Sequence, residues 1–554
     1  SVAIGRLALY AQDPASAADM NNTAVGYNAG AAATTATAST LIGSQAGSAL
    51  TSGINNTAVG AFSLNTDTLG KFSVAVGNGA LERQNFTSST NVYNTAVGYD
   101  AGSRITTGVQ NTLIGGLAGD AITTANNNTA VGQAALSATT TGGSNVAIAT
   151  NALGSNTTGG ANVAIGQDAL FNNTTASNNT AVGHNALVAN TTGAENVAVG
   201  RLALQANTTG ATNTALGAVS LYGNTTGASN VAVGDNALQG NTTASFNTAV
   251  GRQALALNTT GASNIGIGHQ ALYTNTTGAS NVSIGHGSLY NNTTASNNTA
   301  VGYFSLLSNT TGTGNVALGY GALDANTTAN YSTAVGFNAL TSSTGTYNTS
   351  LGQDAGSQVT TGTHNVFIGA GAGSHGINAT TGGQNVILGA FSDVATEGTN
   401  SSIVIGYNVT GVADYCTIGN AANDIRAAHG NVTWATVSDQ RYKKDIVDST
   451  AGLSFINALQ PRTFKYKTLG ELPETFNAYE ADSTKVFKNS DTNHGFIAQE
   501  VKAAIDADDS IKDGFRLWDD RPDGSQEVAE AALIPVLVKA IQELTARLET
   551  LEGE

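Results

Sequence analysis

Apolar residues recur along most of the chain in a five-residue pattern: Asn, then Val or Thr, then usually Ala, then Ile, Val or Leu, then Gly. In one unit, residues 162–178, Val163 and Ile165 flank an alanine, which gives the period of a short β-strand. Gly166 follows, where a side chain would obstruct a bend, and residues 169–170 supply a second apolar stretch. The unit predicts two short strands and two turns, and therefore no helical repeat.

The pattern repeats with a nearly constant spacing. It ends at 24 positions from Gly5 to Gly406, mostly 17 residues apart, with Ala149 once in place of glycine. One coil buries too few apolar side chains to offset the conformational entropy of its backbone, so the coils must stack. We therefore expect an all-β rod over residues 1–406, a parallel β-roll or β-solenoid of 24 coils that is on the order of 110 Å long.

Both faces of the predicted strand are apolar. The position before the glycine is always Ile, Val or Leu, and the position before that is usually Ala. A solitary solenoid needs only one buried face. The second face, made of small residues, indicates that neighbouring chains pack together on it, most simply around a threefold axis. We therefore expect a homotrimer.

Charge is distributed very unevenly. The chain has 554 residues and 58 charged side chains, of which 36 lie in residues 438–554. Its net charge of −16 argues against a nucleic-acid partner, and no apolar run approaches the ~20 residues of a membrane helix. The single cysteine, Cys416, fits no disulfide or metal pattern, so we expect no metal and no cofactor. Because the chain starts at Ser1 inside a repeat, we expect a fragment or a processed form.

Near-identical coils create a problem of alignment between chains. Shifting one chain by 17 residues restores almost every contact, so many alignments have nearly equal energy. A distinct, charged and aperiodic element should align the chains first. Residues 438–554, which follow a connector over residues 407–437, have this character.

The C-terminal region should end in a long helix. Its apolar residues alternate three and four positions apart, which is typical of a coiled coil. Ile at the first core position with Leu at the second favours two strands in isolation, whereas we expect the globular part to impose three. The seam residues are Ile534, Leu537, Ile541, Leu544, Leu548 and Leu551.

Two resemblances follow from these motifs. The repeated N-[VT]-A-[IV]-G unit resembles the left-handed β-roll of YadA-like trimeric adhesin heads and similar arrays in phage tail fibres, although its 17-residue period is longer. The segments "SDQRYKKDI", "LQPRTFKY", "HGFIAQEV" and "LIPVLVKAIQEL" closely resemble the endosialidase-type intramolecular chaperone of phage tailspikes and tail fibres. This second resemblance implies a small α+β domain that directs trimerisation and folding and then cuts itself off.

The chaperone resemblance also implies a cleavage site. It places the cleaved bond between Val437 and Ser438, with Ser438 as the nucleophile and Lys443 as its base. A serine hydroxyl is a weak nucleophile at neutral pH and needs an adjacent base. A lysine can serve when burial or a cationic neighbour lowers its pKa. Lys444 is both such a neighbour and the alternative base. Residues implied as supporting are Asp439, Arg441 and Lys444. The only enzymatic activity expected is this self-cleavage, without turnover of an external substrate.

Aromatic and histidine rings occupy one position in five consecutive coils of the rod, just after the motif glycine. Rings at one coil position should stack along the rod. An exposed ladder of rings is a candidate contact for a glycan or another receptor, and the alternative is that the rings simply pack on one another. The candidate residues are His269, His286, Tyr303, Tyr320 and Phe337, with Tyr273 and Tyr290 nearby.

The sequence therefore predicts a trimeric phage tail fibre for attachment to a host surface. Its location would be the extracellular virion tail, and its partner a glycan or protein receptor. One alternative is a trimeric adhesin of the bacterial cell surface that carries the same chaperone. A second alternative is a glycan-degrading tailspike, in which carboxylates would have to meet across chains because the rod sequence shows no close pair.

Overall fold

The computed structural model describes residues 1–13, 19–376, 379–430, 435–436, 440–509, 511–512, 515, 517–521 and 524–553. The chain divides into two compact units, Ser1–Val437 and Ser438–Glu554. Each unit is described by itself below.

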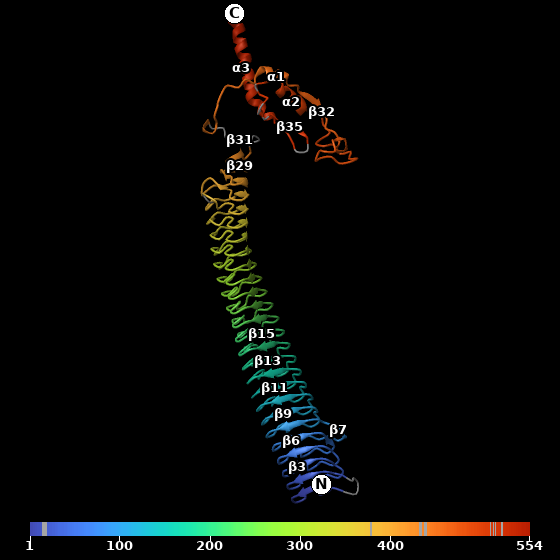
Figure 1. The fold of residues 1–554 in the computed structure, drawn as a ribbon. Coiled ribbons are helices and arrows are strands. Elements are labelled where there is room, and N and C mark those ends of the chain that lie inside the picture. Colours follow the sequence, from blue (N-terminus) through green and yellow to red (C-terminus); the bar gives the residue numbers. More distant parts are fainter. Residues whose placement is uncertain are drawn as a thin grey trace. The chain divides into compact units, whose positions relative to one another are not determined.

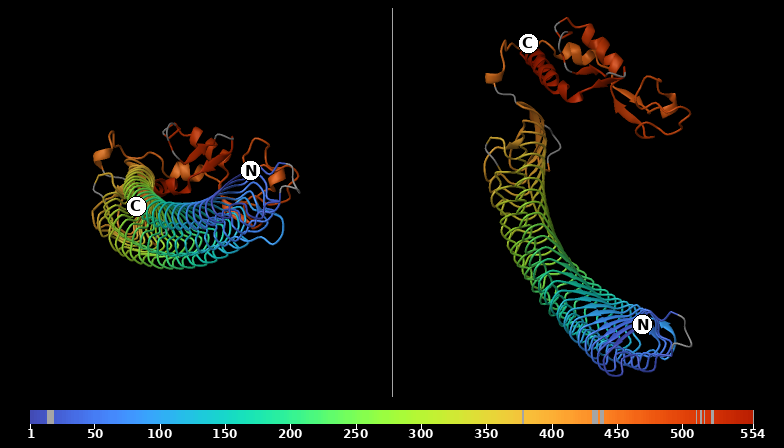
Figure 2. Two further views of the ribbon diagram at one scale, coloured as in Figure 1. Left: turned by 90° about the horizontal axis from the view of Figure 1, so that it is seen from below. Right: turned by 60° about the horizontal axis from the view of Figure 1, so that its bottom comes forward.

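The first unit is a β-solenoid of about 24 turns, as expected (Figure 1). Each coil contributes one short strand, and the coils stack along a gently curved path (Figure 2). The stacked strands are β1 Val2–Ile4, β2 Thr23–Val25, β3 Thr40–Ile42, β4 Thr57–Val59, β6 Val74–Val76, β8 Thr95–Val97, β9 Thr112–Ile114, β10 Thr129–Val131, β11 Val146–Ile148, β12 Val163–Ile165, β13 Thr180–Val182, β14 Val197–Val199, β15 Thr214–Leu216, β16 Val231–Val233, β17 Thr248–Val250, β18 Ile265–Ile267, β19 Val282–Ile284, β20 Thr299–Val301, β21 Val316–Leu318, β22 Thr333–Val335, β23 Thr349–Leu351, β24 Val366–Ile368, β25 Val386–Leu388 and β27 Ile403–Tyr407.

All of these strands pair in parallel and in register, so that like residues of successive coils lie next to each other; Ala164, for example, pairs with Ala181. After the last motif the stack continues through β29, Tyr415–Asn420, which pairs in parallel with β27. It then turns back into antiparallel strands. The remaining strands of the unit are β30 Asn423–Ala428, β31 Ala435–Thr436 and the small pairs β5 Gly70–Lys71 with β7 Thr90–Asn91 and β26 Asp393–Val394 with β28 Thr410–Gly411.

The alanine face of each strand points into the solenoid. Ala164 is fully buried, whereas Ile165 is 37% exposed on the opposite face. The expectation that the small-residue face packs between chains is therefore wrong. The interior of a 17-residue coil is narrow, and the side chains of Leu170 and two asparagines already occupy it. Beside a turn leucine only a small side chain fits at the strand centre, so the larger apolar residues of this coil face outward.

The second apolar stretch is a turn and not the strand that its sequence predicts. Leu170 has a φ of 52° and Asp168 a φ of 55°, both in the left-handed region. This segment nevertheless bonds to the next coil, because the Leu170 amide donates to the carbonyl of Ala186 at 3.0 Å. Alternating backbone handedness thus curls the chain tightly and keeps the hydrogen bonds between coils.

Two ladders of buried asparagines run through the solenoid, one before the strand and one in the "NTT" turn. In the first, Asn162 accepts from the Asn179 backbone amide at 3.0 Å and donates to the carbonyl of Ala176 at 2.9 Å. In the second, the amide of Asn173 donates to Asn156 Oδ1 at 2.9 Å. Each buried amide is therefore satisfied by neighbouring coils, which a buried polar group requires. Because the "NTT" asparagines are buried, these strings are structural and not exposed glycosylation sites.

The second unit is a small α+β fold, also as expected. Three helices pack together: α1 Leu453–Ala458, α2 Ala498–Asp506 and α3 Leu533–Glu552. Their shared core contains Phe455, Val501, Ile505, Leu517 and Val536. The other elements are β32 Arg462–Phe464 with β33 Asn493–Gly495, β34 Trp518–Asp520 with β35 Gln526–Val528, and the short 3-10 helices η1 Gln440–Tyr442, η2 Leu469–Glu471 and η3 Glu530–Ala532.

Candidate functional site at the start of the second unit

The three residues around the expected cleavage point, Val437, Ser438 and Asp439, lie outside the described residues. The segment that follows begins with η1, and the Lys443 amide donates to the carbonyl of Gln440 at 3.0 Å. This turn places the next two lysines directly after a short helical segment.

Arg441, Lys443 and Lys444 are all exposed in the single chain. A lysine acts as a base at neutral pH only when burial or a cationic neighbour lowers its pKa. The described residues of one chain do not supply that burial. Burial of a lysine at this position would therefore require further atoms around it, such as those of neighbouring chains.

The other three motifs of the C-terminal region converge in one core. The "LQPRTFKY" segment follows α1 and forms β32, the "HGFIAQEV" segment forms β33 and the start of α2, and the "LIPVLVKAIQEL" segment forms α3. Phe455, Val501 and Val536, one residue from each helix, are buried together. Motifs that are far apart in the sequence thus build one compact unit.

An ion pair joins two of these motifs. Arg462 on β32 donates from Nε and Nη2 to the two carboxylate oxygens of Glu500, at 2.9 and 2.7 Å. The hydrogen bond to Glu500 raises the pKa of Arg462, and the bond from Arg462 lowers the pKa of Glu500. Both side chains are partly exposed, so the pair adds little stability. Its geometry fixes the strand β32 to the first turn of α2.

A second polar contact joins the last helix to the first. Glu543 on α3 accepts a hydrogen bond from the Leu453 backbone amide at 2.9 Å. This amide belongs to the first turn of α1, where backbone donors have no partner within the helix. Glu543 thus caps α1 from a position 90 residues away in the sequence. Neither this contact nor the Arg462–Glu500 pair was predicted from the sequence.

Residues 438–509 match the family model described as the chaperone of endosialidase. The match begins at Ser438, the residue expected to be the nucleophile, and it spans the first three motifs. No curated protein and no solved structure matches the chain. Together with the β-solenoid, the match indicates a trimeric fibre or tailspike type of protein with a chaperone unit at its C-terminal end.

The chaperone unit presents an apolar seam on α3. The six residues with heptad spacing are exposed, from 43% for Leu537 to 73% for Leu551. The opposite side of the helix, with Leu533, Val536 and Ala540, packs into the core. The helix therefore has one face for its own unit and one free apolar face, as a coiled-coil strand has before it meets its partners.

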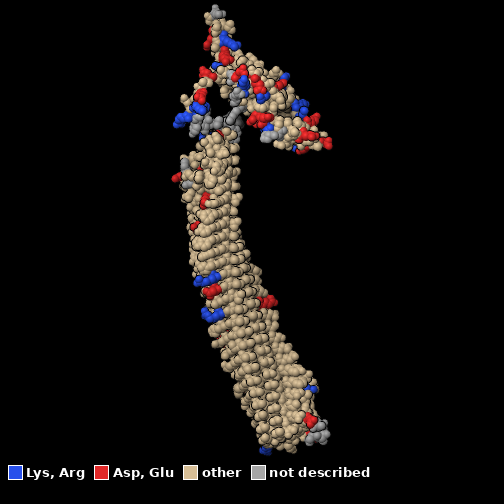
Figure 3. Space-filling model, in the orientation of Figure 1, with Lys and Arg blue, Asp and Glu red and all other residues tan. Residues whose placement is uncertain are grey.

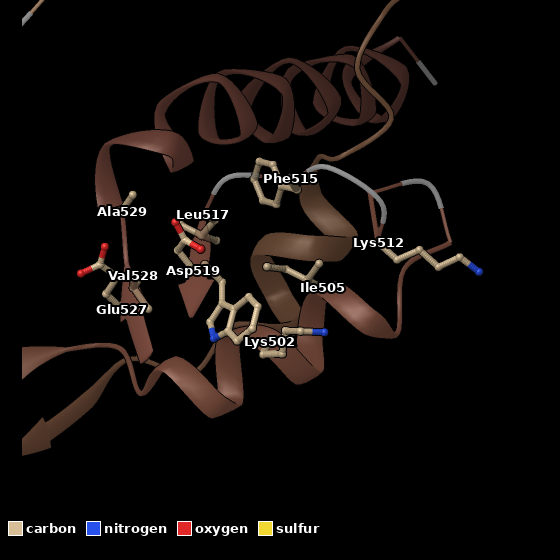
Figure 4. Close-up of a pocket in the computed structure, with 10 residues that line it drawn as sticks. Lys502, Ile505, Lys512, Phe515, Leu517, Asp519, Glu527, Val528 and Ala529 are labelled. Atoms are coloured by element: carbon tan, nitrogen blue, oxygen red, sulfur yellow. The ribbon is translucent and has the colours of Figure 1, made fainter. Parts of the chain in front are cut away.

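A hollow of about 950 Å³ opens beside α2 and β34 (Figure 4). Trp518 and Phe515 form its apolar wall, and the ammonium group of Lys502 lies over the Trp518 ring, 5.1 Å from its centroid.

Among the described residues, no group of three or more His, Cys, Asp or Glu side chains gathers as a metal site requires. Within the residues that the structure describes, no helix is long and apolar enough to cross a membrane.

The ring ladder predicted on the rod is present. Its neighbouring ring centroids are 4.9 to 5.3 Å apart from His269 through His286, Tyr303 and Tyr320 to Phe337. Tyr273 and Tyr290 stack at 5.2 Å in the same way. Tyr303, Tyr320 and Phe337 lie nearly parallel, so each covers the face of the next ring and leaves its edge partly exposed to solvent. Contact with a receptor therefore stays a prediction, and these stacked rings would make it through their edges.

Proposed function

We propose that the protein is a trimeric fibre that attaches to a host surface, namely a phage tail fibre of the extracellular virion tail. Its chaperone unit brings three chains together and then removes itself by cleavage between Val437 and Ser438. The observation that carries this proposal is the family match that begins at Ser438, at the boundary between the two compact units.

The outward face of the solenoid supports assembly. Every coil presents two apolar or threonine side chains there, in a parallel ladder without interruption. Ladders on two copies have the same spacing between coils, so a second copy fits along the whole length. A continuous apolar face of this size is typical of a surface that binds a partner. Charged side chains are sparse on the rod and gather on the chaperone unit (Figure 3). The outward ladder includes Ile148, Ile165, Val182, Val199, Leu216, Ile267, Ile284, Leu318, Leu351, Ile368 and Ile405.

The cleavage chemistry needs one hydroxyl, one base and water. Ser438 Oγ attacks the carbonyl carbon of Val437, and its proton passes to a lysine amine, Lys443 or alternatively Lys444. The peptide bond becomes an ester, and the Ser438 amine is released with a proton returned from the base. Water then hydrolyses the ester, which leaves a carboxylate on Val437 and restores the hydroxyl. Asp439 and Arg441 would orient these groups.

Self-removal has a physical purpose. Once three chains interlock over two dozen coils, they separate only by crossing a high barrier. The lifetime of the fibre is therefore set by the rate at which its chains unfold and separate. The chaperone is needed to start assembly and not to maintain it. Cleavage therefore leaves a fibre that cannot return to its unassembled state by the same route.

Intact mass and denaturing gels with and without boiling test the proposal. The wild-type chain should give fragments of residues 1–437 and 438–554, and the unboiled rod should migrate as a trimer. Ser438→Ala should stay whole, whereas the control Ser449→Ala, in the same exposed segment, should be cut. Comparing Lys443→Met with Lys444→Met identifies the base. Equal cutting of the Ser438→Ala chain at this bond would show that the nucleophile assignment is wrong.

Attachment would use the ring ladder at residues 269–337 as a contact for a host glycan or protein. Removing the outermost hydroxyls, as in Tyr303→Phe with Tyr320→Phe, should weaken binding to host cells. The control Tyr10→Phe removes a hydroxyl far from the ladder in sequence and should bind normally. A trimeric adhesin of the bacterial cell surface remains the alternative to a phage tail fibre. Release of oligosaccharide from host polysaccharide would instead favour the glycan-degrading tailspike.

A further inference from the structure

We propose that the two margins of the outward strand face meet between neighbouring copies of this chain and set their register. The leading margin is the residue before the buried Asn or Ser that precedes each strand. The trailing margin is the residue after the motif glycine. This inference rests on the proposed trimer, and it adds which residues of one copy contact which residues of the next.

Both margins lie on the outward side of the coil. Around β14, Glu195 is exposed, Asn196 is buried, Val197 is 38% exposed and Ala198 is buried. After the motif glycine, Arg201 is again exposed. Glu195 and Arg201 are thus exposed residues that flank the outward positions of one strand, one on each side. When three such outward faces pack around a common axis, the leading and trailing margins of each copy lie where it meets its two neighbours.

Cyclic symmetry determines which margins meet. In a ring of identical chains each copy uses two different patches, one toward each neighbour. The trailing margin of one copy therefore faces the leading margin of the next. Symmetry also places equal residues at equal height along the axis. Because a coil rises only about 4.8 Å, the two margins of the same coil number lie at nearly the same level.

The margins of single coils carry matching side chains. In four coils both margin residues are aromatic or charged, and in each case their chemistry is complementary. Two coils offer an aromatic pair, one an acid with an arginine, and one a ring with an arginine, which is a cation–π combination. The exposed rings range from 49% for Phe337 to 67% for Phe246. The pairs are Tyr93 with Tyr99, Glu195 with Arg201, Phe246 with Arg252, and Tyr331 with Phe337.

The pair of Glu195 and Arg201 distinguishes the aligned register of two copies from a register shifted by one coil. Glu195 is the only carboxylate on the leading margin of the 23 coils whose leading-margin residue lies in the sequence. Neither Glu195 nor Arg201 forms an ion pair with another described residue of its own chain. A shift of one coil would place Glu195 opposite His184 or Ala218 instead of Arg201. A shift of one coil in either direction therefore separates the two opposite charges, so these residues oppose the smallest slip that identical coils would otherwise permit.

The same alignment keeps part of the ring ladder accessible. Opposite four of its rings, the leading margin carries only small or polar residues. These pairs would leave a groove between copies, lined by ring edges. The facing pairs are Ser263 with His269, Ser280 with His286, Asn297 with Tyr303, and Gly314 with Tyr320.

A charge-swap series tests the margin contact in the full chain. Like charges placed together are destabilising, so Glu195→Arg and Arg201→Glu should each speed dissociation of the unboiled trimer in detergent by about tenfold. The double variant should return the rate to within about twofold of wild type. Arg83→Glu, an exposed arginine outside both margins, is the matched control and should leave the rate unchanged.

A cross-link gives a second readout. In an Arg201→Lys variant, carbodiimide should join Glu195 of one chain to the introduced lysine of another, giving a dimer band and a defined linked peptide. A link within one chain would give no dimer band, so the band distinguishes contact between chains from contact within one. A monomeric wild-type protein would refute the trimer itself. A wild-type trimer with unchanged single variants, or without the link, would refute only the margin contact.

Discussion

At the residue scale, the motif glycine is fixed by two constraints at once. Gly166 has a φ of +130°, and a Cβ built on it would lie 2.6 Å from the carbonyl oxygen of Gly183 in the next coil. The same close approach recurs along the stack. Ala149, which stands at this position in one coil, adopts a φ of 110°. It is therefore a strained member of an otherwise uniform ladder.

Adding a side chain at the motif-glycine position should lower the stability of the rod, and removing the one at Ala149 should raise it. Gly166→Ala should destabilise the rod by about 1–3 kcal/mol, the usual cost of a residue held in an unfavourable backbone region. Ala149→Gly should stabilise it by about 1 kcal/mol for the same reason. Denaturant unfolding of the rod measures both. Gly116→Ala is the control, because its new methyl would meet nothing closer than 4.0 Å. Equal effects at all three positions would contradict the close-contact explanation.

Asp67 is a buried carboxyl inside the solenoid, at the ladder position that asparagine fills elsewhere. It accepts hydrogen bonds from the amides of Gly70 and Phe86, both at 3.1 Å, and from Gln84 at 2.8 Å. Burial raises the pKa of Asp67 despite these bonds, which lower it. The folded state therefore favours the protonated acid more than the unfolded chain does.

The sign of the pH dependence follows. The contribution of Asp67 is complete below its unfolded pKa, near 3.9, and it is lost as pH rises through the raised folded value. The melting temperature of the rod should therefore fall as pH rises above about 4 and passes through the raised folded pKa of Asp67. Asp67→Asn should make this decline smaller. Burial also raises the pKa of Asp120 and Asp324, which leaves part of the slope in the variant. An unchanged slope would show that Asp67 ionises without cost.

At the element scale, the core of each coil has a fixed volume that neighbouring coils share. Where the strand centre is Leu113 instead of alanine, the turn leucines beside it are replaced by Gly102 and Gly119. A Cβ on these glycines would lie 2.7 and 2.8 Å from the Leu113 side chain. Phe367 lies between Gly356 and Gly373 in the same way. Large and small residues thus exchange places between strand and turn.

This exchange can be reproduced in a regular coil. Ala181→Leu should cost about 1–3 kcal/mol through overpacking, because Leu170 and Leu187 already fill the space. Replacing those two leucines by glycine in the same chain should recover much of the loss. Both leucines have positive φ, 52° and 53°, which glycine adopts readily. Denaturant unfolding of the four related chains measures the coupling, and purely additive losses would contradict shared volume.

The exposed seam of α3 makes a separate prediction about assembly. Ile541→Ser with Leu548→Ser should reduce the yield of trimer severalfold, while the chaperone unit keeps its fold because its core uses the other helix face. Val538→Ser, a 50% exposed residue off the seam, is the matched control. Light scattering gives the mass, and circular dichroism reports the fold. Normal trimer yield from the seam variant would rule out a role for this face.

The sequence predicted the strands of the rod because period-2 alternation and a bend-forming glycine are local signals. It failed on the direction of the alanines because both strand faces are apolar, and periodicity alone does not choose the inner one. The pairing of Leu113 with two glycines is the signal that decides it. The sequence predicts a strand around Leu170, where the structure has a turn, because a leucine at positive φ is rarely expected.

The candidate site was predictable only in part. Resemblance of the motif around Ser438 predicts a cleavage point that lies outside the described residues and stays a prediction, and the family match begins at that residue. The Arg462–Glu500 pair joins residues 38 positions apart, and no local pattern relates them. Contacts of this kind depend on how helices and strands are brought together, and a single sequence gives no measure of that.

At the scale of the whole molecule, the two units solve different problems. The rod has a repeated interior that stabilises any number of coils, but repetition also permits several alignments of similar energy. The chaperone unit has no internal repeat and a compact core of its own. In the proposed function this unit brings three chains together at one defined point, before the rods stack.

The most direct test is the mass of the rod made without residues 438–554. Native mass spectrometry and electron microscopy would compare a chain of residues 1–437 with the rod released from the full chain. The account predicts aligned trimers from the full chain, and monomers or ragged aggregates from the shortened one. Uniform, aligned trimers from the shortened chain in good yield would contradict it.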